Sequence, residues 1–108
     1  MKVILILLLS LSCLQRTHAQ SPSEVVASRI LQKMKDTLNL TSREAKNIDS
    51  INKLLFERKS IARKKVFEPV ELQKAIQQVE NTRDSLYQLV LPTQKFIIYR
   101  KKKANLVN

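Results

Sequence analysis

Hydrophobic side chains recur along most of this chain at the spacing of an α-helix, with polar and charged side chains between them. From about Ser23 to Leu38, the apolar positions follow an i, i+3, i+4, i+7, i+11 pattern, which places them in one stripe along a helix. The positions in this stripe are Ala27, Ile30, Leu31, Met34 and Leu38. The pattern predicts a first helix over residues 23–38, after a polar leader at residues 20–23 and before a connector at residues 39 and 40.

A second helix is predicted to begin at Thr41, because the segment from Thr41 to Glu44 has the form of a capping box. In this motif the threonine hydroxyl accepts the amide hydrogen of the residue three positions later, whose carboxylate accepts the threonine amide hydrogen. The helix is expected to run to about Val66 or Phe67. Its apolar stripe consists of Ile48, Ile51, Leu55 and Ala62, widened by Leu54 and Ile61.

A third helix is expected from about Pro69 to Leu91, where apolar residues follow a heptad-like spacing. Arg83 fills the one polar position of this seam, and we expect its stem to lie along the seam with its head paired to Glu80 or Asp84. The apolar seam positions are Leu72, Ile76, Val79, Leu86 and Val90.

Pro92 interrupts the third helix and can open a fourth, from Thr93 to about Asn105, which carries a basic run. The aromatic side chains at residues 87, 96 and 99 have helical spacing, so we expect them to pack in the core or in a dimer contact. They are Tyr87, Phe96 and Tyr99.

The composition favours helices over strands along the whole chain. There is no glycine, there are three prolines, and aromatic residues make up 5% of the sequence, whereas hairpin turns and strands draw on glycine and on aromatic and β-branched residues. We therefore expect an all-α fold, an elongated antiparallel helical hairpin of three to four helices in a single domain at residues 20–108. Because so small a domain has a marginal core, we also expect a homodimer that buries the apolar flank of the hairpin.

The first 19 residues have the three parts of a secretory signal peptide. Lys2 supplies a positive start, and residues 3–11 are apolar apart from Ser10. Residues 17–19, which end at Ala19, present small side chains at the two positions that signal peptidase recognises. We predict cleavage after Ala19 and a periplasmic or secreted protein. Acylation at Cys13, as in a bacterial lipoprotein, is the less favoured alternative because Ser10 stands where leucine is usual.

Cleavage after Ala19 would remove the only cysteine and the only histidine, which excludes several kinds of chemistry from the remaining 89 of 108 residues. Disulfides, zinc sites of cysteine and histidine, cysteine nucleophiles and histidine-based triads all need those residues. The missing glycine excludes phosphate-cradling loops. We expect no catalytic residues, no metal and no cofactor, and the protein is predicted not to be an enzyme.

The remaining chain is strongly basic, with 18 lysines and arginines after loss of Lys2 and Arg16 against 9 acidic residues, a net charge of +9. In an exported protein such a charge favours acidic proteins or anionic surfaces as partners, and we expect no nucleic acid. The candidate residues for binding clients or anions are Arg58, Arg63, Lys64, Lys65, Arg100, Lys101, Lys102 and Lys103. The alternative is that these basic runs serve the helix dipole and solubility.

Four segments along the chain resemble a known family. They are Asp36 to Ala45, Ile48 with Ile51-Asn52, Arg83 to Tyr87, and Val90 to Tyr99. The sequences of these segments are similar to those of the periplasmic Spy/CpxP family and resemble its small Bacteroidetes-like variants. Members are exported, helical, dimeric and basic, and carry two Leu-Thr-x-x-Gln motifs. The first maps onto Leu40, Thr41 and Glu44, with glutamate replacing glutamine, and the second onto Leu91 and Gln94, one residue short and with Pro92 in place of threonine.

The resemblance implies an exported ATP-independent chaperone-like or envelope-stress protein that binds unfolded or partner proteins without chemistry. The metal-sensing branch of the family is excluded because its members bind the ion with histidines, and the chain after Ala19 has none. The motif residues also read as plain helix capping. The alternative function is a cationic amphipathic protein that binds anionic membrane or polysaccharide surfaces, with residues 96–103 as the anchor. A regulatory partner of one envelope protein is a further possibility.

Overall fold

The computed structural model describes residues 20–108 and shows an all-α fold there, as the sequence predicts. It contains α2 (Pro22–Leu38), α3 (Ser42–Lys65), α4 (Pro69–Val90) and α5 (Thr93–Leu106), with no strand in this part of the chain. The predicted signal peptide and Cys13 lie outside the described residues. No helix within residues 20–108 combines the length and the apolar character that crossing a membrane requires.

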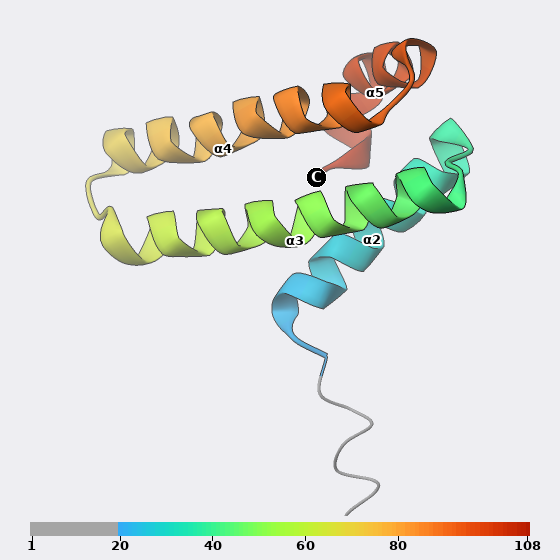
Figure 1. The fold of residues 1–108 in the computed structure, drawn as a ribbon. Coiled ribbons are helices and arrows are strands. Elements are labelled where there is room, and N and C mark those ends of the chain that lie inside the picture. The colour runs from blue at the N-terminus through green and yellow to red at the C-terminus, as the bar shows by residue number, and fades with distance from the viewer. Residues whose placement is uncertain (1–19) are drawn as a thin grey trace, which may run out of the picture.

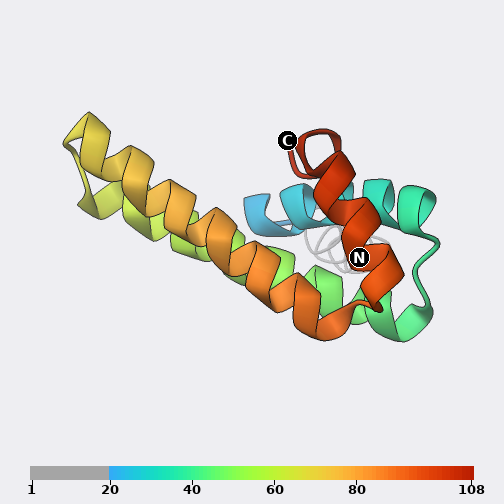
Figure 2. The same ribbon diagram turned by 90° about the horizontal axis from the view of Figure 1, so that it is seen from above.

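The helices α3 and α4 form an antiparallel hairpin, and α2 and α5 pack near one of its ends (Figure 1). At 1.5 Å per residue, the 24 residues of α3 and the 22 of α4 span about 36 and 33 Å. The tip of the hairpin extends beyond the other two helices in both views (Figures 1 and 2). We call residues 56–78 the distal hairpin and the end covered by α2 and α5 the base.

Within residues 20–108, α2, α3 and α4 each begin at a side-chain cap, whereas α5 begins after Pro92 without one. Ser21 accepts a hydrogen bond from the amide of Glu24, and Pro22 follows it, so α2 begins at Pro22, before the expected Ser23, and the polar leader is shorter. The side chain of Glu68 accepts from the amides of Val70 and Glu71 at the start of α4. The remaining boundaries lie within about two residues of the predicted ones, the usual scatter of helix ends.

The core lies in the base, where all four helices contribute to one cluster. Its buried residues are Ile30, Met34, Leu38, Ile48, Tyr87, Leu91, Tyr99 and Leu106. Tyr87 and Tyr99 meet edge to face, with ring centroids 4.8 Å apart, and both are fully buried. The expectation that these tyrosines pack in the interior is confirmed.

The seam of α4 is rotated from the predicted heptad. Tyr87, which the heptad omits, is fully buried, whereas Leu72, Ile76, Leu86 and Val90 are only half-buried. Arg83 lies in the seam as expected, 3% exposed, with its Nε 3.1 Å from a carboxylate oxygen of Glu80. Asp84 instead faces α5. The side of α4 that carries Tyr87 packs against Tyr99 of α5 in the core of the base.

Candidate functional site

The two motif copies meet at the base of the hairpin. Thr41 and Glu44 form the predicted capping box, with the Thr41 amide 2.9 Å from Glu44 Oε1 and the Glu44 amide 3.2 Å from Thr41 Oγ1. Lys95 of α5 lies 2.6 Å from the same Glu44 oxygen and donates to the carbonyl of Asn39. Hydrogen bonds from Lys95 and then from Thr41 lower the pKa of Glu44 below its ordinary value.

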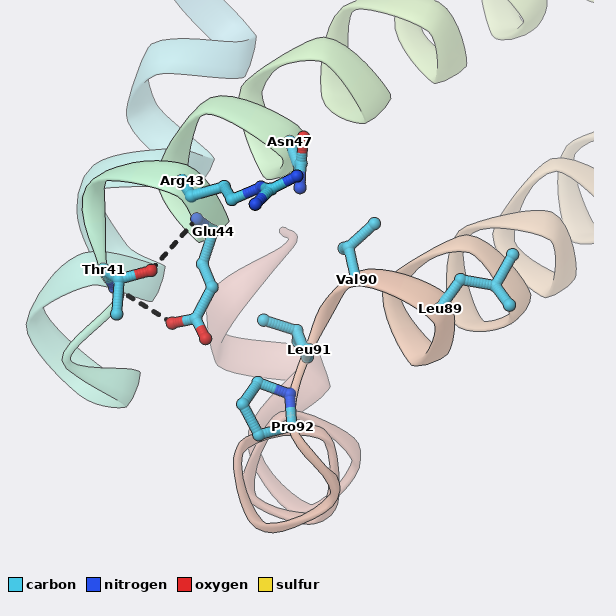
Figure 3. Close-up of a pocket in the computed structure, with 8 residues that line it drawn as sticks. All are labelled: Thr41, Arg43, Glu44, Asn47, Leu89, Val90, Leu91 and Pro92. Atoms are coloured by element: carbon cyan, nitrogen blue, oxygen red, sulfur yellow. Dashed lines mark hydrogen bonds between the residues drawn. The ribbon is translucent and has the colours of Figure 1, made fainter.

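An open cleft of about 510 Å³ lies between the start of α3 and the end of α4 (Figure 3). Thr41, Arg43 and Asn47 line one side, and Leu89 and Pro92 lie on the other. The Glu44 carboxylate on this cleft is already held by Thr41 and Lys95, so it does not act as a free acid or base.

The other motif positions have different surroundings. Leu40 is half-buried and packs against the core, and Leu91 is part of that core. Gln94 is exposed on the first turn of α5 and does not line the cleft. The two motif regions thus lie close together, and their contacts are structural. Thr41 and Glu44 cap α3, Leu91 packs in the core, and Glu44 pairs with Lys95 of α5.

A second polar cluster lies between α3 and α4, around Arg83. Its Nη1 donates to Asn52 Oδ1 at 2.9 Å and to the Tyr87 hydroxyl at 3.0 Å, and the Tyr87 hydroxyl also donates to Asn52. Lys59 lies 2.5 Å from Glu80, the carboxylate that also pairs with Arg83. Burial raises the pKa of Glu80, but the hydrogen bond from Lys59 and the charge of Arg83 outweigh it, so that the pKa is lowered.

Sequence reasoning identified Arg83 and Glu80 but missed Asn52 and Lys59. The sequence offered one indication of these partners. A charged residue in an apolar seam must have polar partners on the facing helix, but its position does not show which residues they are.

A third polar cluster joins α4 to α5 through Asp84. This carboxylate accepts the hydroxyl of Tyr99 at 2.7 Å, Arg100 Nη1 at 2.6 Å and Lys103 Nζ at 2.9 Å. Burial alone would raise the pKa of Asp84, but its hydrogen bonds from Tyr99 and Lys103 hold the pKa below its usual value. Burial, followed by the bond to Asp84, raises the pKa of Tyr99 well above its ordinary value.

The predicted cationic residues fall into two groups with different environments. Arg100 and Lys103 pair with Asp84, and Lys101 joins them and Lys59 around a depression of about 550 Å³. Lys102 is exposed on the same helix. The second group is exposed on α3 and makes no ion pair with any residue of 20–108; it consists of Arg58, Arg63, Lys64 and Lys65.

The distal hairpin, which carries the second group, also exposes apolar side chains. No residue between Leu55 and Val79 is buried. Phe67 in the connection between α3 and α4 is 83% exposed, and Val70 and Ile61 are at least half exposed. Apolar side chains and unpaired cations therefore share this surface.

Among residues 20–108, no three acidic, histidine or cysteine side chains gather in a way that could hold a metal ion. Comparisons of the chain with protein-family models, with curated proteins and with solved structures find no match.

Proposed function

We propose that the protein is an exported binding protein, with a chaperone-like or envelope-stress role of the Spy/CpxP type, which holds unfolded or partner proteins without ATP and without chemistry. The observation that carries this proposal is the distal hairpin, where 23 consecutive residues, 56–78, contain no buried side chain although they include Phe67, Val70 and Ile61. A soluble protein that leaves such side chains uncovered on a projecting element offers them to a partner.

The charges next to these side chains support an acidic, incompletely folded partner. Arg63, Lys64 and Lys65 precede Phe67, with Val66 between, and are free of ion pairs within residues 20–108. Positive charge raises the rate at which an acidic chain is captured, and apolar contact then holds it at about 25 cal/mol per Å² of buried surface. Because these apolar side chains are individually exposed along a projecting element, binding would be weak and spread over many client segments.

The test is aggregation of an unfolded acidic protein, followed by light scattering in the absence of ATP. The purified protein should suppress scattering at a few-fold molar excess, and about 1 M salt should weaken the effect by screening the cations. No suppression at several-fold excess would refute the proposal.

A pair of variants assigns the activity to the distal hairpin. Phe67→Ser should reduce suppression, whereas Leu89→Ser should leave it nearly unchanged. Leu89 is a matched control because it is 81% exposed, close to the 83% of Phe67, but lies at the base end of α4. Equal losses in both variants would show that the binding surface is not confined to the distal hairpin.

The proposal includes a homodimer in which part of the distal hairpin of each copy is covered by the other. Its support is the same uncovered apolar surface on a chain too small to bury it alone. Sedimentation equilibrium checks it: a mass that stays at one protomer up to high concentration would exclude the dimer. Mass spectrometry of the native N-terminus tests the exported state, since a chain beginning at Gln20 is expected.

A second candidate function is binding to an anionic membrane surface. The tip of the hairpin is a better candidate for the membrane contact than the C-terminal segment at residues 96–103. Phe96 is half-buried and lies against the fully buried Tyr99, with ring centroids 5.8 Å apart, so these aromatic rings are held by the core. Phe67 is free, and three cations precede it. Co-sedimentation with anionic but not neutral vesicles, lost in Phe67→Ser, would support this function.

A further inference from the structure

A small pocket of about 210 Å³ lies beside the Arg83 cluster, and Arg63 at its edge also belongs to the basic run of the distal hairpin. Its apolar lining comes from three elements: Val26 and Ile30 of α2, Phe56 of α3, and Val107 directly after α5. Its polar lining comes from the hairpin and consists of Asn52, Lys59, Arg63 and Arg83. The pocket is thus amphipathic, with one apolar wall and one wall of hydrogen-bond donors.

Asn52 has an unfilled donor at this site. The side chain is 2% exposed, and its Oδ1 accepts hydrogen bonds from Arg83 and Tyr87. Those bonds fix the amide oxygen towards α4, and Nδ2 is buried without an acceptor among the described residues. Buried polar atoms are nearly always paired, so an unpaired donor in a residue that lines a pocket indicates a ligand with an acceptor oxygen.

The charges around the pocket call for a negative ligand. Lys59, Arg63 and Arg83 supply three positive charges, and Glu80, which pairs with Lys59, Arg83 and Lys103, can balance only one of them. Arg63 forms no ion pair within residues 20–108 and lies at the exposed edge of the pocket. Two positive charges are therefore in excess where the donor of Asn52 is unfilled.

We propose that this pocket binds an aliphatic carboxylate. The carboxylate accepts from Asn52 Nδ2 and pairs with Arg63 and Lys59, and its hydrocarbon chain lies along Val26 and Phe56. A single carboxylate balances one of the two excess charges and fills the donor of Asn52, whereas a purely apolar ligand would leave Asn52 unpaired and both charges uncompensated. The ligand is either a free medium-chain fatty acid or the C-terminal residue of a peptide, which offers the same carboxylate beside an apolar side chain.

Isothermal titration of the purified protein with octanoate, below its micellar concentration, tests the proposal directly. Saturable binding of one octanoate per chain is expected, and octanol, which has the same chain without the charge, should bind at least about tenfold more weakly. Absence of saturable octanoate binding, or equal binding of octanol, would overturn the proposal. The same titration with a short peptide that ends in a leucine carboxylate, and with the amidated form of that peptide, distinguishes the two sources. If the natural ligand is a peptide C-terminus, the free-acid peptide should bind at least as tightly as octanoate and the amidated form more weakly. If it is a fatty acid, the free-acid peptide should bind more weakly than octanoate.

A matched pair of variants places the octanoate in this pocket. Arg63→Gln should weaken binding about tenfold, while Lys64→Gln, which removes the same charge from the neighbouring exposed residue that does not line the pocket, should change it less than twofold. Equal weakening in both would mean that octanoate responds to the general charge of α3 and would refute the site. Octanoate binding and suppression of client aggregation are both measured for Arg63→Gln and for Phe67→Ser, because Phe67 does not line the pocket and its loss should reduce suppression while leaving octanoate binding unchanged.

Discussion

The base and the distal hairpin are built from the same two helices, yet they differ in almost every physical respect. At the base, α2 and α5 cover α3 and α4, and the buried tyrosines, leucines and isoleucines meet in one cluster. In the distal hairpin α2 and α5 lie close to only a few residues, such as Lys59, and no side chain from residue 56 to 78 is buried. The base therefore supplies most of the folding free energy, and the distal hairpin is the part that can change its contacts without unfolding the protein.

The charges are divided in the same way. Lys95, Arg100 and Lys103 at the base each pair with a carboxylate from another helix, which fixes the orientation of α5. The basic run of α3 towards the tip has no such partners in the described part of the chain. Part of the positive charge is therefore used in ion pairs between helices at the base, and the cations towards the tip are left without ion pairs within residues 20–108.

The largest expected difference compares one substitution at two places on α3. Ile48→Ala removes a fully buried side chain and should lower the free energy of unfolding by about 2–5 kcal/mol, whereas Ile61→Ala, at a half-exposed position, should change it by less than about 0.5 kcal/mol. Urea unfolding followed by circular dichroism measures both. Similar losses would show that the two regions are equally packed in solution.

The next effect concerns the Asp84 cluster, which ties α5 to the hairpin. Asp84→Asn removes the charge that holds Arg100 and Lys103 and weakens the bond from Tyr99, so a loss of about 1–3 kcal/mol is expected. Asp49→Asn is the control, because within residues 20–108 Asp49 forms an ion pair only with the exposed Lys53 on its own helix. A loss as large for Asp49 as for Asp84 would contradict the role of the cluster.

The same carboxylate predicts a pH dependence. The pKa of Asp84 is lower in the folded protein than its ordinary value of 3.8, because its hydrogen bonds outweigh its burial. Its contribution is therefore complete above the unfolded-state pKa and is lost as the pH falls through the lower folded-state pKa. The urea midpoint of the native protein should fall between about pH 5 and pH 3, and the part of this fall due to Asp84 should be missing in Asp84→Asn.

A smaller effect is expected at the start of α3. Thr41→Ala removes the side-chain half of the capping box and should cost about 1 kcal/mol, whereas Ser42→Ala, one residue further on and without a cap bond, should be nearly neutral. Thermal unfolding of both variants is the measurement. A neutral Thr41→Ala would mean that the Lys95 bridge to Glu44 alone holds this end of the helix.

The four helices could be predicted from the sequence because their boundaries depend on local chemistry. A capping box at Thr41, prolines at residues 22, 69 and 92, and the spacing of apolar residues each act within a few positions along the chain. The aromatic character of Tyr87 predicted its burial, but the heptad did not place it in the seam of α4, because that position depends on how α4 packs against α5.

The candidate site was only partly predictable for the same reason. The cationic residues are evident from composition, and the pairing of Arg83 with Glu80 follows from a separation of three residues. Asp84 reaches Arg100 and Lys103 over 16 and 19 residues, and Arg83 reaches Asn52 over 31. Such partners depend on how helices cross, and no periodicity within one helix indicates them.

The smallest expected change in the free energy of unfolding is at Phe67. A small change is informative there because it would show that this side chain is not packed within its own chain. Phe67→Ala should leave the free energy of unfolding within about 0.5 kcal/mol, although truncating a buried phenylalanine costs about 3–5 kcal/mol. Unfolding at two protein concentrations distinguishes the reasons for any larger loss. A loss that grows with concentration would place Phe67 against a second copy, while a loss independent of concentration would mean that the tip is packed within its own chain, contrary to the contrast with the base.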